Sequence, residues 1–358
     1  LALCTVNFDD DSFATIGPDS ATQADDHFNT VLYTGSGSTQ SITGVGFQSD
    51  WSWFKRRDAS VNHALYDSTR GGTNALRSNT DGAESQFGDA VITFQSDGFQ
   101  IAGTNVSGIN GSSDSMVAWN WKANGGTTSS NTDGSITSTV QANTTAGLSV
   151  ITYTGGGSAG DTIGHGLNSA PEQVWFKRRD SSGNWMNYVK AMGNNGYMNL
   201  DRTNGKDTGG SPVNNTDPSS SVITLGSFQS LNGNTNTYVA YAFHSVEGYS
   251  KFGSYNGNGN ADGPFVFTGF RPAWVLIKNT ARSADWRLHD IARQPINDDG
   301  GHILLPNSSS SEVTNEYDID FLSNGFKLRS GDVYENGDGE LLIYAAFAED
   351  PFKYANAK

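Results

Sequence analysis

Short runs in which apolar and polar residues alternate follow one another along the whole chain. Val117, Trp119 and Trp121 share one face of such a run, which is the two-residue period of a half-buried β-strand. The segments 96–99 and 323–326 read Ser-Asp-Gly-Phe and Ser-Asn-Gly-Phe, and Asp-Gly or Asn-Gly between apolar runs is the strongest short-range signal for a β-hairpin. Because no window carries a capped stripe of 3.6-residue period, the pattern predicts an all-β protein.

The same phrases recur three times in the same order. The run Trp-Ser-Trp-Phe-Lys-Arg-Arg-Asp over 51–58 returns as Val-Trp-Phe-Lys-Arg-Arg-Asp over 174–180 and, more loosely, as Trp-Val-Leu-Ile-Lys over 274–278. Two further phrases open and close each copy, and a fourth lies late in the copy but survives only as a remnant in the second. They occupy residues 32–37, 152–157 and 254–259, then 117–122, 239–244 and 343–348, and finally 92–101, 223–228 and 319–328. Four matching anchors indicate three copies of a whole small domain rather than the rungs of a solenoid.

The three copies define the expected domain organisation. Each copy holds about six to eight short strands, so the sequence predicts three tandem antiparallel β-sandwiches of the jelly-roll or lectin-like type. The second copy includes a run at 134–140 that can pair with 148–153. Because each copy carries its own strands, we expect each to have its own core and few contacts with the others. The expected divisions are an acidic lead-in that follows a missing upstream domain and then the three sandwiches, at residues 1–28, 29–124, 125–248 and 249–358.

The composition agrees with this fold and excludes several function classes. Glycine is abundant, with 43 residues, and aromatic residues make up 11% of the chain, a mixture of turn formers and core formers that suits a β-protein. The net charge of −15 disfavours binding to nucleic acids or to anionic membrane surfaces. We expect no signal peptide and no membrane insertion, because no run approaches the length of a membrane span. The single Cys4 excludes an internal disulfide and suits folding in a reducing cytoplasm.

Aligning the copies gives little support for an active site. The pair Asp67 and Arg70 recurs in the third copy at 290 and 293, which a structural salt bridge or a strand-end contact explains. A hydrolase could use His63 with Asp67 and a serine such as Ser68, but no Gly-x-Ser-x-Gly motif accompanies them. We therefore expect no catalytic residues and no enzymatic activity.

Metal and cofactor sites are equally weakly indicated. The six histidines are scattered without metal-ligand spacing. The loops 258–263 and 335–340 are rich in Asn, Asp and Gly, but the first lacks the leading aspartate and the closing glutamate of a calcium loop. Turns of this composition are also ordinary in β-proteins. The sequence therefore predicts no cofactor and leaves Ca²⁺ as the open alternative.

The remaining candidates for chemistry are a basic run and a few aromatic residues. The basic run at 54–58 and 176–180 is expected to lie at a sheet edge or to form salt bridges, because alternation divides its cations between two faces. Aromatic residues near loop tips, with Asn and Asp beside them, can stack on sugar rings. A place in the core or between copies is the alternative for each of them. These candidate glycan contacts are Trp185, Tyr197, Trp286 and Tyr334.

Several longer phrases resemble the repetitive structural proteins of marine tailed phages. They occupy residues 129–138, 142–147, 163–167, 246–254, 262–274 and 346–358, and the resemblance extends from about Phe28 to the C-terminus. In that family the repeats often follow a lectin-like SPRY sandwich, and the segment from Leu1 to Val6 resembles the junction after it. The resemblance implies a virion-associated protein, made in the host cytoplasm and displayed on the particle surface, and it transfers no catalytic residue.

Three functions fit such a virion protein. The first is a tail fibre or appendage that attaches the particle to a host-surface glycan, with other virion proteins as partners and a homotrimer as the expected assembly, by analogy with other phage appendages. The second is a capsid decoration protein, and the third is a polysaccharide depolymerase. A cellular surface adhesin is a further alternative. The modular repeats and the polar Asn, Ser, Thr and Gly surface favour the tail fibre.

Overall fold

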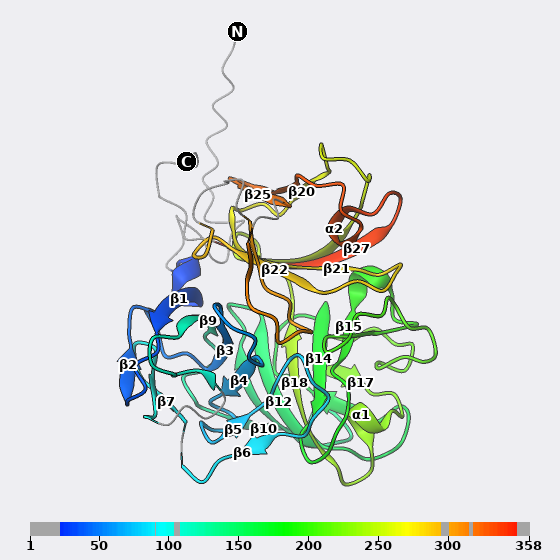
Figure 1. Ribbon diagram of the computed structural model, residues 1–358. Helices are drawn as coiled ribbons and strands as arrows, with labels where there is room; N and C mark the ends of the chain where they lie inside the picture. Colours follow the sequence, from blue (N-terminus) through cyan, green and yellow to red (C-terminus); the bar gives the residue numbers. More distant parts are fainter. Residues whose placement is uncertain (1–21, 90, 104–107, 295–300, 315–317, 349–358) are drawn as a thin grey trace, which may run out of the picture.

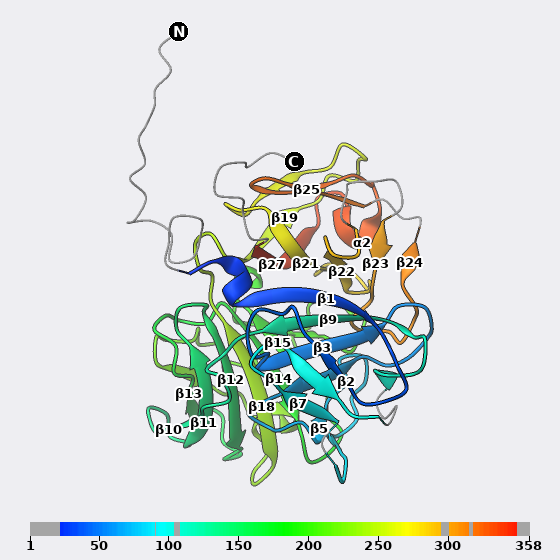
Figure 2. The same ribbon diagram turned by 90° about the vertical axis from the view of Figure 1, so that its left-hand side faces the viewer.

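The computed structural model describes residues 22–89, 91–103, 108–294, 301–314 and 318–348 (Figure 1, Figure 2). The regular structure consists mainly of antiparallel sheets, with 41% strand and 5% helix, so the expectation of an all-β protein is confirmed. Residues 1–21 of the predicted lead-in lie outside the described residues. The helices in the described ranges are single turns, and none of them could cross a membrane. They are η1 (Ala24–Asp26), η3 (Lys190–Met192), α1 (Gln229–Asn232) and α2 (Val333–Asn336).

The strands form three sets that follow the three sequence copies, and these sets are called units 1, 2 and 3. Unit 1 holds β1 (Phe28–Thr34), β2 (Gln40–Ile42), β3 (Trp51–Arg56), β4 (Ala64–Asp67), β5 (Asn74–Ala75), β6 (Ser85–Gln86), β7 (Ile92–Phe94), β8 (Phe99–Ile101) and β9 (Ser115–Trp121). Unit 2 holds β10 (Ser129–Asn131), β11 (Ser138–Asn143), β12 (Leu148–Thr154), β13 (Thr162–Gly164), β14 (Gln173–Arg178), β15 (Met186–Val189), β16 (Met198–Asn199), β17 (Val222–Thr224) and β18 (Thr237–Phe243). Unit 3 holds β19 (Ser250–Asn256), β20 (Phe265–Phe267), β21 (Pro272–Asn279), β22 (Arg287–Asp290), β23 (His302–Ile303), β24 (Val313–Thr314), β25 (Ile319–Leu322), β26 (Gly325–Leu328) and β27 (Leu341–Ala348).

The three units repeat one sheet order. The main sheet runs β1-β9-β3-β4 in unit 1, β12-β18-β14-β15 in unit 2 and β19-β27-β21-β22 in unit 3, and unit 2 extends it with β10 and β11 on one side and β16 on the other. A smaller sheet accompanies each, namely β2-β8-β7, β13-β17 and β20-β26-β25. The predicted hairpins join β7 to β8 and β25 to β26. The end of the predicted run 134–140 pairs with β12 as expected, through Thr139 and Val140, whereas Ile136 forms a bridge with Ile163 instead.

Both faces of the central strands β9, β18 and β27 of the main sheets are buried. In β9, Val117, Trp119 and Trp121 point into a core that all three units share, whereas Met116 and Ala118 point into a core of unit 1 alone. The residues of β18 divide in the same way between the shared core and a core of unit 2. The two-residue period of the strands therefore sends every second side chain to the centre of the molecule.

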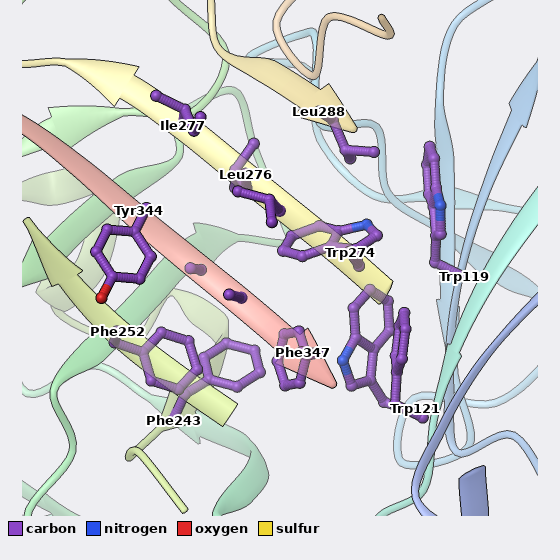
Figure 3. Close-up of a cluster of buried hydrophobic side chains, with 14 of the residues drawn as sticks. Trp119, Trp121, Phe243, Phe252, Trp274, Leu276, Ile277, Leu288, Tyr344 and Phe347 are labelled. Atoms are coloured by element: carbon purple, nitrogen blue, oxygen red, sulfur yellow. The ribbon is translucent and has the colours of Figure 1, made fainter. Parts of the chain in front are cut away.

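The shared core overturns the expectation that each unit has few contacts with the others. The rings of Trp51 in unit 1 and Tyr241 in unit 2 stack with centroids 4.7 Å apart. Phe347 of unit 3 has its ring centroid 5.6 Å from that of Trp121 and 6.3 Å from that of Phe243, and Figure 3 shows these three rings gathered at one place. Large aromatic side chains that small separate cores would leave partly exposed are buried completely when three sheets enclose them together.

Matched residues join the units into a closed ring. Trp185 of unit 2 donates from Nε1 to the carbonyl of Arg77 in unit 1, and Trp286 of unit 3 donates to the carbonyl of Asn199 in unit 2. His63, which aligns with these two tryptophans, places Nε2 3.0 Å from a backbone carbonyl of unit 3. Figure 1 shows the resulting arrangement, with the blue to cyan, green and yellow to red lobes around a common centre.

The basic run contributes to the same ring. Arg57 of unit 1 pairs with Glu312 of unit 3, and Arg179 of unit 2 pairs with a glutamate of unit 1, so the expected salt bridges are confirmed. The expected edge position is wrong, because β3 and β14 are interior strands whose two neighbours cover them. The lysines of the run are fully buried, and each donates from Nζ to a backbone carbonyl of the next unit. These pairs are Lys55 with Ser309, Lys177 with Asp81, and Lys278 with Thr203.

Lys278 is expected to make stability depend on pH in the alkaline range. Burial lowers the pKa of Lys278 from 10.5 to about 7. Between these values the unfolded chain binds more protons than the folded one, so the contribution of Lys278 to the free energy of unfolding rises with pH, by up to about 1.4 kcal/mol per pH unit. Denaturant titrations of the parent protein and of Lys278→Met at several pH values between about 7 and 10 measure this contribution as a difference. A difference that does not change across this window would contradict the expectation.

Candidate functional site

The four candidate glycan contacts occupy different environments. Trp185 and Trp286 are fully buried between units, and a buried ring cannot stack on a sugar, so both leave the set of candidate contacts. Tyr334 is exposed, but the Arg287 guanidinium lies 4.8 Å from the centroid of its ring and covers one face. Tyr197 is half-buried and lies in the wall of a cavity.

This cavity, called the junction pocket, lies where unit 2 meets unit 3. Its volume is about 720 Å³, which falls within the usual range for small-molecule sites. Polar side chains make up its wall, and all but one come from unit 2. The wall residues are Asn184, Tyr197, Asn199, Asp201, Arg202, Thr203, Asn204, Asp207 and Asn307.

Contacts between the two units hold the pocket wall in place. The loop after β16 is fixed to unit 3 at Thr203, whose carbonyl accepts hydrogen bonds from Lys278 Nζ and from the backbone N–H of Ala284, both at 2.8 Å. Three residues further on, the backbone N–H of Lys206 donates to the carbonyl of Thr280 at 2.7 Å. The pocket is therefore a consequence of the ring, and unit 2 alone would not complete it.

Two carboxamide oxygens of the wall are buried without a hydrogen-bond partner among the described residues, Oδ1 of Asn199 and Oδ1 of Asn204. Asn199 is only 4% exposed. A buried acceptor that lacks a donor costs about 1–3 kcal/mol, and such atoms in a native structure call for an explanation. Because both oxygens are closed off from solvent, a ligand in the pocket does not reach them in this arrangement.

The two carboxylates of the wall are held differently. Asp207 accepts the Tyr197 hydroxyl at 3.0 Å and the backbone N–H of Gly209 at 2.7 Å. Burial and the bond to Asp207 raise the pKa of Tyr197 to about 12, so the phenol is protonated at neutral pH. Asp201 accepts the backbone N–H of Trp185 at 2.9 Å. Burial raises the pKa of Asp201 from 3.8 to about 6, against the opposing effect of that hydrogen bond.

The chemistry of this wall suits recognition of a polyol. Carboxamide and carboxylate oxygens accept hydrogen bonds from hydroxyl groups. The aromatic group of the wall is the half-buried ring of Tyr197, whose centroid lies 5.3 Å from that of Phe228. The cation in the wall is engaged, because Arg202 donates to Asn184 Oδ1 at 2.9 Å and lies 3.8 Å from a carboxylate oxygen of Asp81. The wall therefore accepts more hydrogen bonds than it donates.

A second cavity lies where unit 1 meets unit 3, and its charged groups are already paired. It has a volume of about 340 Å³ and is lined by Arg57, Asp58, Ser115, His302, Ser311, Glu312 and Thr314. Glu312 accepts two hydrogen bonds from Arg57 and one from His302. Because this carboxylate is satisfied within the protein, the second cavity is the weaker candidate.

The residues of the hydrolase alternative are not brought together. Asp67 pairs with Arg70 and Asp290 with Arg293, fully buried in each case, so the structural salt bridge is confirmed. His63 Nδ1 accepts the indole N–H of Trp53, and burial lowers the pKa of His63 to about 3. Ser68 donates to Asp50 instead. Both ring nitrogens of His63 are therefore occupied, and neither His63 nor Asp67 is a hydrogen-bond partner of Ser68.

The loops that suggested Ca²⁺ are held by an asparagine. Asn336 Nδ2 donates to Asn258 Oδ1 at 3.0 Å and to the carbonyl of Asn260 at 2.8 Å. Asn110 and Asn232 bind the glycine-rich loops of units 1 and 2 in the same way. No cluster of three His, Cys, Asp or Glu side chains suited to a metal occurs within the described ranges. The oxygens of the 258–263 loop thus have an amide as their partner.

Sequence reasoning named Tyr197 but none of the other wall residues. They belong to an Asn- and Asp-rich loop whose composition is that of any turn, and they meet unit 3 only through the ring. One signal was available. Asp201 matches Asn79 of unit 1 and Asn307 of unit 3, since each stands three residues after an apolar residue of its loop. An alignment of these loops would have shown one acidic residue among three matched positions.

These features define an all-β protein of three repeated units that share one core and hold a polar, acceptor-rich pocket at one junction. The profile of a family described as "Domain of unknown function (DUF7483)" matches residues 23–351. The match covers most of the chain, so the protein belongs to this family. No curated protein matches the chain.

Proposed function

We propose that the protein is the host-attachment part of a phage tail fibre or appendage and that it binds a host-surface glycan without cleaving it. The resemblance to repetitive structural proteins of marine tailed phages supports the virion location. The observation that carries glycan binding is the wall of the junction pocket, where Tyr197 lies beside amide and carboxylate acceptors.

The finer architecture belongs to the same proposal. The main sheet and the smaller sheet of each unit are the two layers of a jelly-roll or lectin-like sandwich, and the three sandwiches are displayed on the particle surface. The chain forms a homotrimer, and other virion proteins hold this trimer on the particle. Light scattering of the intact protein tests the assembly, and the mass of a monomer would count against the trimer.

The Tyr197→Ala variant tests the binding role. Loss of the ring is expected to weaken binding of the fluorescently labelled chain to host cells about two- to tenfold, because stacking on an aromatic face contributes about 0.5–1.5 kcal/mol. Tyr334→Ala is the matched control, since Tyr334 is an exposed tyrosine outside the pocket wall, and it should bind as the parent does. Near-UV circular dichroism confirms folding of both variants. Equal binding by all three proteins would contradict the proposal.

Localisation in the particle tests the proposed place in the tail fibre or appendage. Antibody against the chain should label the tail or its appendages, and label confined to the capsid shell would favour a decoration protein instead. Release of oligosaccharides from host polysaccharide would point to the depolymerase.

A further inference from the structure

Three matched side chains, one in each unit, have the same structural task. Each accepts a hydrogen bond from the backbone N–H of the residue just before β4, β15 or β22. The pairs are Asn79 Oδ1 with His63 at 3.1 Å, Asp201 Oδ1 with Trp185 at 2.9 Å, and Asn307 Oδ1 with Trp286 at 2.8 Å. A carboxamide oxygen performs this task in units 1 and 3, so the task does not require a carboxylate.

Unit 2 nevertheless has a carboxylate at this position, and it is unfavourable for folding. Asp201 is largely buried, and its charged form is disfavoured there, because burial raises its pKa to about 6. Asparagine has nearly the same shape and could not be ionised. A charged residue at a position where a neutral one would stabilise the fold better is characteristic of functional sites.

Asp201 also differs from its two counterparts in its surroundings. It lines the junction pocket together with Asn199, whose buried Oδ1 has no partner among the described residues. Among the described residues, Trp185 is the one residue besides Asp201 itself that donates a hydrogen bond to the Asp201 carboxylate. A carboxylate has about four lone-pair sites, so it can accept several donors at once. Two adjacent hydroxyl groups of a sugar match this capacity, and charge-assisted bonds to them are stronger than neutral ones.

We propose that Asp201 is a ligand-binding residue and that it accepts hydrogen bonds from adjacent hydroxyl groups of a neutral saccharide in the junction pocket. This inference rests on the proposed glycan binding and names the class of glycan. Acidic sugars are excluded by charge, since Asp201 and Asp207 both line the pocket and the chain carries a net charge of −15.

Saturation-transfer NMR with the intact chain tests the inference directly. The probes are the methyl glycosides of mannose, galactose, glucose and fucose, with methyl glucuronide as the acidic comparison. The parent protein is expected to bind at least one neutral glycoside and not the glucuronide at neutral pH. Asp201→Asn should weaken that binding at least tenfold and raise the midpoint of thermal unfolding. The control is Asn79→Asp, which makes the reverse exchange at the matched position of unit 1, outside the pocket wall. It should leave glycoside binding unchanged and lower the midpoint of thermal unfolding.

The outcomes separate this inference from the proposed function. Binding of neutral glycosides that Asp201→Asn leaves intact would overturn the role of Asp201 while host-cell attachment stands. Preference for the glucuronide would overturn the assignment of a neutral sugar. Host-cell attachment without binding of any glycoside would overturn the inference alone, and loss of both would overturn the proposed function as well.

Discussion

Replacing Trp121 by alanine is expected to unfold all three units together. The ring centroid of Trp121 lies 4.3 Å from that of Trp51 in unit 1 and 5.7 Å from that of Trp274 in unit 3. Removing a buried tryptophan costs about 3–5 kcal/mol, which is a large part of the ~5–15 kcal/mol that stabilises a typical protein. Because the lost contacts belong to two units, the loss is expected to lower the stability of both and, through the shared core, of the third.

Equilibrium unfolding in denaturant measures this effect, followed by tryptophan fluorescence and by far-UV circular dichroism. The two probes should give one coincident transition at a lower midpoint. Leu32→Ala is the control, because Leu32 is 43% exposed on β1 and its truncation should change the free energy of unfolding by no more than about 0.5 kcal/mol. Separate transitions for separate units would show that the units fold independently.

The Arg70→Met variant is expected to lose about 3–5 kcal/mol, because it leaves a buried carboxylate without its partner. The Arg70 guanidinium is fully buried and contacts Asp67 at 2.5 Å and Glu84 at 2.7 Å. It also lies 3.2 Å from the hydroxyl of Tyr241 in unit 2. Denaturant titration of the variant measures the loss.

Unit 2 itself provides the control for this prediction. At the positions that match Asp67 and Arg70 it carries Val189 and Met192, both buried in the shared core. The double variant Asp67→Val with Arg70→Met copies this apolar pair. It should recover part of the stability, because no charge is left unpaired while the buried Tyr241 hydroxyl loses both of its partners. If the double variant is as unstable as Arg70→Met, loss of packing rather than an unpaired charge explains the effect.

The strands and hairpins could be predicted from the sequence because they are local. Alternation along 117–121 and the Asp-Gly and Asn-Gly turns identify them without knowledge of the rest of the chain. The shared core could not be predicted in this way. A tryptophan such as Trp121 looks the same in sequence whether it faces the core of its own unit or another unit, and only the packing of three sheets decides which.

The candidate site shows the same limit. Tyr197 was identified because an aromatic residue near a loop tip is rare enough to notice. Asn199 and Asp201 were not, because Asn and Asp are ordinary loop residues and the third unit completes the wall. Lys278, which anchors the loop at Thr203, lies in the looser third copy of the strand. A fully buried lysine that donates to carbonyls runs against the usual preference of lysine for the surface.

The junction pocket exists only if the three units fold as one body, and native-state hydrogen exchange of the unmodified protein tests this most directly. Amides of β9, β18 and β27 lie in the main sheets that enclose the shared core. We expect their slowest-exchanging amides to report the same free energy of opening, within about 1 kcal/mol, and to respond to denaturant together. Free energies that differ by several kcal/mol between the units would contradict a shared core and leave three independent domains.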